Sequence, residues 1–213
     1  NLWFASMGSG VWKHNPQANS FEKYINKEGE PNSLSSNSVS SVMQDSKGRI
    51  WLSTDRGGIC RYNAETNDFT SFSIKEGLPD DVAYEILEDD AHNLWFGTNK
   101  GLVKFNPETK DIHVFTTKDG LLGNQFNYKS ALKVGDGRFF FGGINGLIAF
   151  DPNISRQQLA PPSPIYISKF SIYNKEITVH TPNSPLKKNI VGTEEIVLPY
   201  NQSNISFDIA LLS

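Results

Sequence analysis

Short runs of apolar and aromatic residues, each four to seven residues long, follow one another through the first 150 positions of the chain. Gly, Asn, Asp or Pro stands at nearly every boundary between these runs, and the runs themselves are rich in β-branched and aromatic residues. Apolar residues at helical spacing are absent from this region. Short strands bounded by turn-forming residues have this pattern. It predicts an all-β protein built from many short antiparallel strands.

One of these runs recurs four times with a large ring at the same place. The ring belongs to Trp3, Trp51, Trp95 and Phe140, at spacings of 48, 44 and 45 residues. Four strands in a unit of about 45 residues are the dimensions of a β-propeller blade. Because the ring returns in every unit, we predict that it packs between adjacent blades and does not form a single binding site.

The repeat defines the expected strands of each blade. We expect first strands at 39–44, 82–88 and 130–134, second strands at 1–6, 49–54, 93–98 and 138–143, third strands at 10–12, 58–62, 101–105 and 146–150, and fourth strands at 69–73 and 112–116. The Asp- and Gly-containing turns between first and second strands have the composition of hairpin turns. Residues 1–160 are therefore predicted to form about three and a half four-stranded blades of a partial β-propeller.

The composition changes after residue 160. Residues 161–164 read Pro-Pro-Ser-Pro, which is a stiff, extended connector. Beyond it we expect strands at 165–172, 176–179, 195–198 and 204–211, the last with Ile205, Phe207, Ile209 and Leu211 on one face. A complete immunoglobulin-like sandwich needs about 100 residues and seven strands. Residues 161–213 are thus predicted to be the first strands of a truncated β-sandwich.

Charge and cysteine content exclude several classes of function. The formal net charge is −3, so the chain offers no basic surface for nucleic acid. No apolar run approaches the roughly 18 residues of a membrane-spanning helix. One cysteine, Cys60, cannot form an internal disulfide, and with only four scattered histidines it cannot build a zinc site. We expect neither a metal site nor a cofactor.

Four segments carry a resemblance to a known family. The unit at 45–63, which reads Asp-x-x-Gly-Arg-Ile-Trp-Leu-Ser-Thr and then Gly-Gly-Ile-x-Arg-Tyr-Asn, resembles the two-component regulator propeller repeat. Residues 77–80, Gly-Leu-Pro-Asp, fit the same repeat, and residues 140–152 resemble its terminal copy. The closing segment 204–210 resembles the start of the immunoglobulin-like triple-tyrosine module that follows such propellers.

The resemblance implies a sensor. Members of this family are hybrid two-component sensors of polysaccharide-utilising bacteria, with propellers and sandwich outside the inner membrane and a histidine kinase inside the cell. It implies that this chain is a periplasmic fragment, linked to the membrane only through a missing downstream helix and dimeric in the full-length sensor. The implied role is to detect oligosaccharides and so control polysaccharide-utilisation genes. Kinase motifs are not found in the chain, so we expect it to be catalytically inert.

One face of the predicted propeller is the candidate ligand face. The loops between second and third strands and the connections between blades share this face, and functional loops on a rigid scaffold are the usual arrangement. The candidate ligand-binding residues are Arg56, Asn99, Lys100, Asn124, Gln125, Asn127, Tyr128 and Asn145.

Two other functions stay open at this point. In the first, the chain is a scaffold for protein interaction or dimerisation and binds no small ligand. In the second, it is a propeller glycosidase or lyase. Glycoside hydrolysis needs two opposed carboxylates, whereas Asp45, Asp89, Asp90 and Asp136 fall in hairpins on the face opposite the candidate site.

Overall fold

Strands account for nearly all the regular structure of the chain, which confirms the all-β prediction. The computed structural model describes residues 1–153 and 165–211. The predicted connector at 161–164 lies outside the described residues. The chain divides into two compact units, 1–154 and 155–213, which are described separately below.

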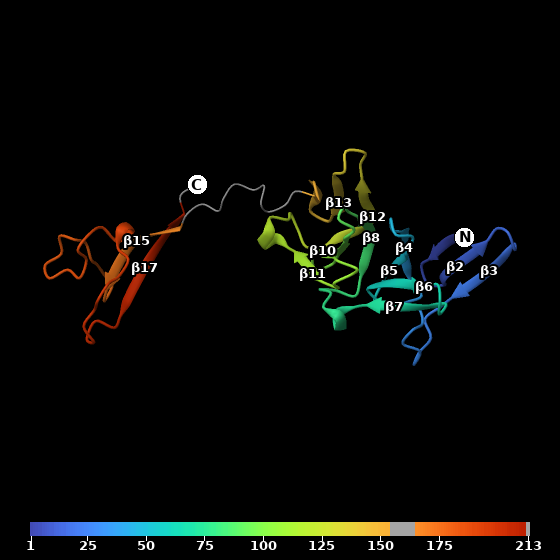
Figure 1. Cartoon of the computed structure of the whole chain (residues 1–213), viewed down its shortest axis with the longest axis horizontal. Coiled ribbons are helices and arrows are strands. Elements are labelled where there is room, and N and C mark those ends of the chain that lie inside the picture. Colours follow the sequence, from blue (N-terminus) through green and yellow to red (C-terminus); the bar gives the residue numbers. More distant parts are fainter. Residues whose placement is uncertain (154–164, 212–213) are drawn as a thin grey trace. The chain divides into compact units, whose positions relative to one another are not determined.

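The first unit is a row of four antiparallel sheets, each of which corresponds to one repeat and is called a blade (Figure 1). Strand order within each blade follows the sequence, so neighbouring strands are joined by hairpins. Blade 1 contains β1 (Leu2–Ser6), β2 (Gly10–Asn15) and β3 (Ser20–Tyr24). Blade 2 contains β4 (Val39–Gln44), β5 (Ile50–Thr54), β6 (Ile59–Asn63) and β7 (Asp68–Phe72). Blade 3 contains β8 (Ala83–Glu88), β9 (Leu94–Thr98), β10 (Leu102–Phe105) and β11 (Ile112–Phe115). Blade 4 contains β12 (Phe126–Lys133), β13 (Phe139–Gly143) and β14 (Gly146–Phe150).

In the first unit, most strand positions agree with the sequence expectations to within a residue or two; the strand β2 extends three residues beyond the expected range 10–12, and two strands differ more. The strand β3 was not expected, because three of its five residues are Ser, Glu and Lys and its only apolar side chains are aromatic rings. The strand β12 begins four residues earlier than the expected range 130–134. This extension matters for the candidate site described below.

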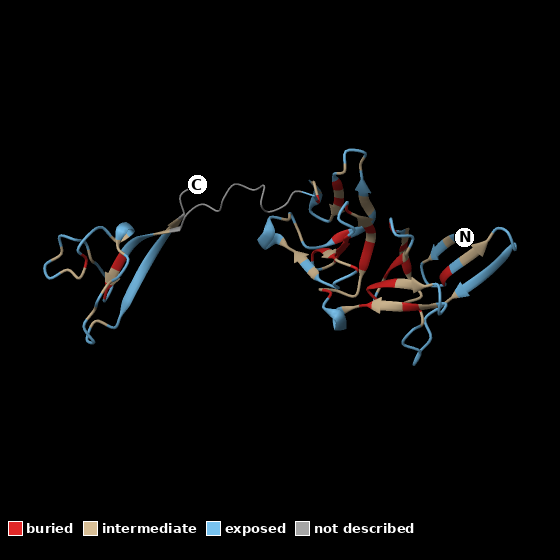
Figure 2. Ribbon diagram, in the orientation of Figure 1, coloured by how far each residue is buried: buried red, intermediate tan, exposed pale blue. Residues whose placement is uncertain are grey.

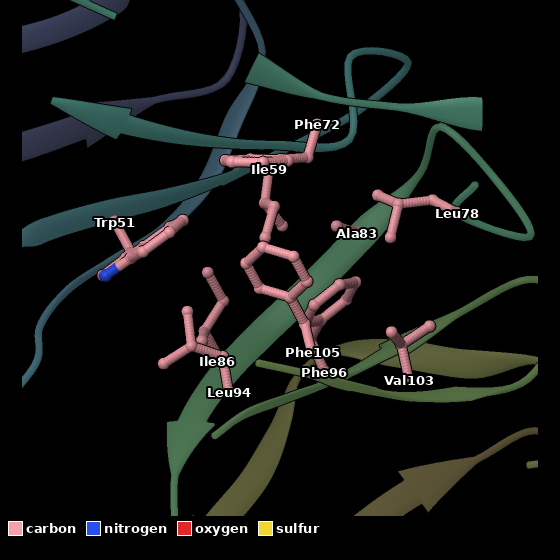
Figure 3. Packing of buried hydrophobic residues seen from close by; sticks show 10 residues of the cluster. All are labelled: Trp51, Ile59, Phe72, Leu78, Ala83, Ile86, Leu94, Phe96, Val103 and Phe105. Carbon is pink, nitrogen blue, oxygen red and sulfur yellow. The ribbon is translucent and has the colours of Figure 1, made fainter. Parts of the chain in front are cut away.

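The repeated tryptophans lie between consecutive blades. Trp51 of blade 2 is fully buried and packs with Phe72 of its own blade and Phe105 of blade 3 (Figure 3). Trp95 of blade 3 packs in the same way against Phe139 of blade 4, and Trp3 packs against the core between blades 1 and 2. A large flat ring buries much area at such a joint. Each blade is therefore held by the ring of the blade before it.

Two of these tryptophans are anchored by a buried aspartate from the preceding hairpin. Asp45 Oδ2 accepts a hydrogen bond of 2.9 Å from the indole Nε1 of Trp51, and Asp89 Oδ2 accepts one of 2.8 Å from Trp95. Asp45 also accepts from the backbone N–H and the Nε of Arg49, at 2.8 and 2.6 Å. The Asp of the hairpin thus fixes the turn and the inter-blade ring together.

Blade 4 lacks both members of this pair. Its hairpin has the same backbone hydrogen bonds, with Val134 in the place that Asp45 and Asp89 occupy in the other blades. The ring six residues further on is Phe140, which has no N–H to donate and is only half-buried. The carboxylate and its indole donor are therefore both present in blades 2 and 3 and both absent in blade 4.

The buried Asp45 makes stability depend on pH. Burial disfavours its charged form, but hydrogen bonds from Trp51 and Arg49 outweigh this, so the pKa of Asp45 lies below its ordinary value. Stability from the ionised carboxylate is complete above the ordinary carboxyl pKa and is lost as the pH falls through the lowered, folded-state pKa. We expect the free energy of unfolding to fall from about pH 4 to about pH 2, and to fall less in the Asp45→Asn variant. Urea unfolding followed by tryptophan fluorescence at each pH measures both; identical pH profiles would contradict the role of Asp45.

The second unit is a three-stranded antiparallel sheet in the order β16-β15-β17. Its strands are β15 (Ile165–Ile172), β16 (Lys175–Glu176) and β17 (Ile205–Leu211). The expected strand at 195–198 is wrong: this segment is irregular, and its Ile196 and Leu198 pack against the cluster around Phe170 without strand pairing. Phe207 and Ile209 of β17 stay 43% and 69% exposed, so the face expected to be covered is largely open.

Burial is concentrated in the middle blades. Figure 2 shows buried residues mainly in blades 2, 3 and 4, while β3 and β17 are largely exposed. Both end blades present an open apolar face, with Leu2, Phe4 and Phe21 on blade 1 and Leu132 and Leu147 on blade 4. Within residues 1–153 and 165–211, no helix has the length and hydropathy needed to cross a bilayer.

Candidate functional site on the propeller axis

Three first strands meet at the centre of the blade row. The strands β4, β8 and β12 contact one another. First strands line the axis of a propeller, so loops at one end of these strands converge there. The converging loops are the β5–β6 turn, the β9–β10 turn and the connections between blades.

The connections between blades are closed by a repeated set of hydrogen bonds. Residues 74–76 and 117–119 form 3₁₀ turns, each with a capping box, at Ser73 and Thr116. Eight residues after each cap, a side-chain oxygen accepts a backbone N–H: Asp81 from Ile74 and Asn124 from Thr117, both at 2.8 Å. Asn124 is thus the counterpart of Asp81 in the next connection, and its carbonyl is occupied by the loop itself.

A group of polar and aromatic side chains lies where the loops converge. Tyr84 of β8 donates a hydrogen bond of 2.7 Å to Asn99 Oδ1, and its ring meets that of Tyr128 edge-on at 4.7 Å. Lys100 lies 3.9 Å from Asp80. We call this group the axial cluster. It includes two charged residues of the β5–β6 turn, Asp55 and Arg56. Its members are Asp55, Arg56, Asp80, Tyr84, Asn99, Lys100 and Tyr128.

The charges of the β5–β6 turn act on the two tyrosines of the cluster. Burial raises the pKa of Tyr128, with the charge of Asp55 adding to the rise and that of Arg56 opposing it. Burial also raises the pKa of Tyr84, helped by Tyr128, Asp80 and Asp55. Both phenols therefore stay protonated at neutral pH and remain hydrogen-bond donors.

A glutamate and a lysine lie beside the axial cluster on two of the axial strands. Burial raises the pKa of Glu85 on β8, and the positive charge of Lys129 on β12 opposes this rise. The pair places one acidic and one basic side chain next to the tyrosines. It adds no net charge to the region.

The eight residues expected at the ligand face divide into two groups. Arg56, Asn99, Lys100 and Tyr128 come together in the axial cluster, and Asn127 lies beside it on β12. The remaining three are part of the loop framework: Asn124 as described, Gln125 through its carbonyl, which accepts from Ile144 N at 3.1 Å, and Asn145, whose amide donates to Leu122 O at 3.2 Å.

Tyr84 is the main residue of the cluster that sequence reasoning missed. It is 6% exposed and lies on a first strand, so its pattern is that of a core residue. The feature that could have identified it is the register of β8 against β9. Tyr84 lies in a β-bulge of β8, between the pairs Ala83↔Thr98 and Ile86↔Phe96, and bulges re-aim side chains near functional sites.

Two grooves border the first blades. One, of about 700 Å³, lies on the loop face beside Arg56, between residues 26–35 and the segment from Phe69 to Asp81. A larger one, of about 1140 Å³, lies at the opposite, hairpin end between blades 1 and 2. Side chains lining the larger groove already bond each other, as Lys13 does with the hydroxyl of Tyr62 at 3.1 Å. We therefore place the candidate site on the loop face. Among the described residues, no three or more His, Cys, Asp or Glu side chains gather as metal ligands would.

Comparison with known proteins agrees with this architecture. Residues 33–56 and 77–100 match the two component regulator propeller family. The chain is similar to the extracellular domain of the hybrid two component system BT3049 from B. thetaiotaomicron, with 27% identity over 98% of the chain and a TM-score of 0.69. The corresponding domain of BT4673 from the same organism has the same fold, with 19% identity over 98% of the chain and a TM-score of 0.58.

A curated relative links the repeats to a kinase. Over 130 residues, 61% of the chain, the sequence is 30% identical to histidine kinase P4 of Formosa agariphila. The chain spans only 9% of that kinase, 27% of the BT3049 structure and 39% of the BT4673 structure. The chain thus carries two-component regulator propeller repeats, and its sequence and fold are similar to those of the extracellular sensor domains of hybrid two-component systems.

Proposed function

We propose that the chain is the ligand-detecting part of a hybrid two-component sensor and that its ligand is an oligosaccharide. The observation that supports this best is the axial cluster, in which amide, charged and phenol groups converge on the propeller axis around a half-exposed aromatic ring. A site with a few directed polar groups on a rigid scaffold is suited to binding a polyhydroxylated ligand. The cluster holds no nucleophile with an adjacent base, so we propose binding without turnover.

The proposal also covers the cellular location of the chain and the signal that the parent protein sends. The chain lies in the periplasm, and the parent protein passes the signal to a cytoplasmic histidine kinase that controls polysaccharide-utilisation genes. The parent acts as a homodimer, with residues 161–213 forming the start of an immunoglobulin-like domain. Ligand binding favours one of two arrangements of the propeller and this domain. Its differential affinity for the two arrangements supplies the energy of the signal.

Titration of soluble oligosaccharides tests the proposal. The protein used is the complete extracellular region of the parent, and binding is followed by isothermal titration calorimetry while the mixture is analysed for products. We expect saturable binding with no change in the oligosaccharide. Shortened or unsaturated products would instead indicate a glycosidase or lyase. No binding of any saccharide would favour the scaffold function, for which the apolar faces of the end blades offer a surface.

A further inference from the structure

The axial strand of blade 4 carries a larger bulge than those of the other blades. In β4 and β8, the register shift leaves one residue more than the partner strand has, between Val39 and Ser41 and between Ala83 and Ile86. In β12, four residues lie between Phe126 and Ala131, opposite a single residue of β13, so the bulge holds three extra residues. Enlarged bulges redirect side chains and end regular pairing.

The enlarged bulge presents Tyr128 to solvent at the axis. Tyr128 is 44% exposed, and its ring makes an edge-to-face contact with the buried Tyr84, whose hydroxyl donates a hydrogen bond to Asn99. The next residue, Lys129, has a φ of 51°, a left-handed conformation that costs about 1 kcal/mol in a residue other than glycine. The chain thus adopts a strained backbone at the point where it exposes an aromatic ring.

Like Lys129, a basic residue of the β5–β6 turn has a left-handed backbone conformation of the kind that glycine favours. Arg56 in the β5–β6 turn has a φ of 69°, where the equivalent turn of blade 1 has Gly8 with a φ of 104°. Arg56 is exposed and lies next to Asp55, so the turn offers a donor group and an acceptor group side by side. Because glycine favours this backbone conformation, Arg56→Gly removes the side chain without straining the turn.

The charges of the axial cluster cancel. Asp55 and Asp80 are matched by Arg56 and Lys100, and Glu85 is matched by Lys129. A polyanion therefore gains no net attraction at this site, and neither does a cation. A neutral sugar suits it better, because each hydroxyl both donates and accepts while the C–H face of the ring is apolar enough to lie on an aromatic side chain.

We propose that Tyr128 is the stacking platform for one uncharged sugar ring, whose hydroxyls are bound by Asp55, Arg56 and Asn99. This inference rests on the proposed function and adds to it a ligand class and a specificity-determining residue. It also explains the bulge of β12: a strand with the register of β4 or β8 has no residue at the place of Tyr128.

The test shortens the bulge. Deleting Tyr128 and Lys129 leaves one extra residue in β12, the number that β4 and β8 carry in the same fold. The protein is the complete extracellular region, and the probes are neutral hexasaccharides of glucose, xylose, mannose and arabinose, and the acidic hexasaccharide of galacturonic acid. We expect a neutral probe to bind, and its Kd to rise at least tenfold in the shortened protein, with the unfolding temperature unchanged or higher.

Point variants keep the test valid if the shortened protein does not fold. Tyr128→Phe preserves the ring and should bind within about threefold of the parent, whereas Tyr128→Ala should lose at least tenfold, or about 1.4 kcal/mol. Arg56→Gly should weaken binding, and Lys110→Gly is its matched control. Lys110 is also basic and exposed, with a φ of 63°, but it lies in the β10–β11 turn at the hairpin end.

Each outcome decides between the two proposals. Neutral binding that depends on the ring of Tyr128 supports both. Binding of galacturonate alone, or neutral binding indifferent to Tyr128→Ala, overturns the inference and leaves the oligosaccharide sensor standing. If no saccharide binds the unmodified protein, the proposed function fails and this inference fails with it.

Discussion

Replacing Trp51 with alanine is expected to lower the free energy of unfolding by about 4 kcal/mol, the largest effect of any single change in the chain. Trp51 is fully buried between blades 2 and 3, where its ring meets Phe72 and Phe105 at 6.1 and 5.9 Å. Removing it leaves a cavity that the flanking sheets, each held by its own hydrogen-bond ladder, cannot close. Chemical denaturation followed by far-UV circular dichroism measures the loss.

Trp12→Ala is the matched control for this prediction. It removes the same side chain from β2, where Trp12 is 36% exposed on the outer face of blade 1. We expect a loss of about 1 kcal/mol or less. Losses of equal size in the two variants would show that the joint between blades 2 and 3 is not the main source of stability.

Replacing Asp45 with alanine is expected to cost about 3 kcal/mol. The change leaves four donors without their acceptor: the indole N–H of Trp51, the backbone and side-chain N–H groups of Arg49, and the backbone N–H of Lys47. Buried donors that lose a partner cost more than the net value of the bond. Arg49 also loses one of its two ion-pair partners and keeps only Glu108, at 2.8 Å.

Asp136→Ala supplies the comparison within the same chain. Asp136 lies in the equivalent hairpin of blade 4 and bonds Arg138, but it is exposed and touches no ring. Its removal should leave the unfolding midpoint nearly unchanged. A midpoint shift as large as that of Asp45→Ala would show that the hairpin turn, and not the bond to the indole, accounts for the effect.

The repeat made most of the fold predictable from sequence. Because each unit repeats the same order of strands and turns, ranges such as 39–44 and 146–150 were predicted to the residue. The wrong strand predictions occur where the apolar pattern does not match the strand pairing. The strand β3 pairs although its pattern is weak, and the apolar segment 195–198 only packs against the Phe170 cluster. Pairing depends on a neighbouring edge, which a local pattern does not reveal.

The candidate site was only partly predictable. Loop residues such as Arg56 and Lys100 could be found because blade topology brings the turns to one end. The role of Asn124 could have been read from its equivalence with Asp81, eight residues after the capping residue in both connections. The bulge of β12 could not, because the spacing of 45 residues between Trp95 and Phe140 is close to the 44 residues between Trp51 and Trp95, so the insertion does not stand out.

The exchange of Asp and Trp for Val134 and Phe140 constrains how such a blade changes over evolutionary time. Phe140→Trp alone would add an indole N–H without an acceptor, and Val134→Asp alone would add a carboxylate without the ring donor. The bond between carboxylate and indole exists only when both residues are present, so we expect the two positions to change together when a blade gains or loses the pair.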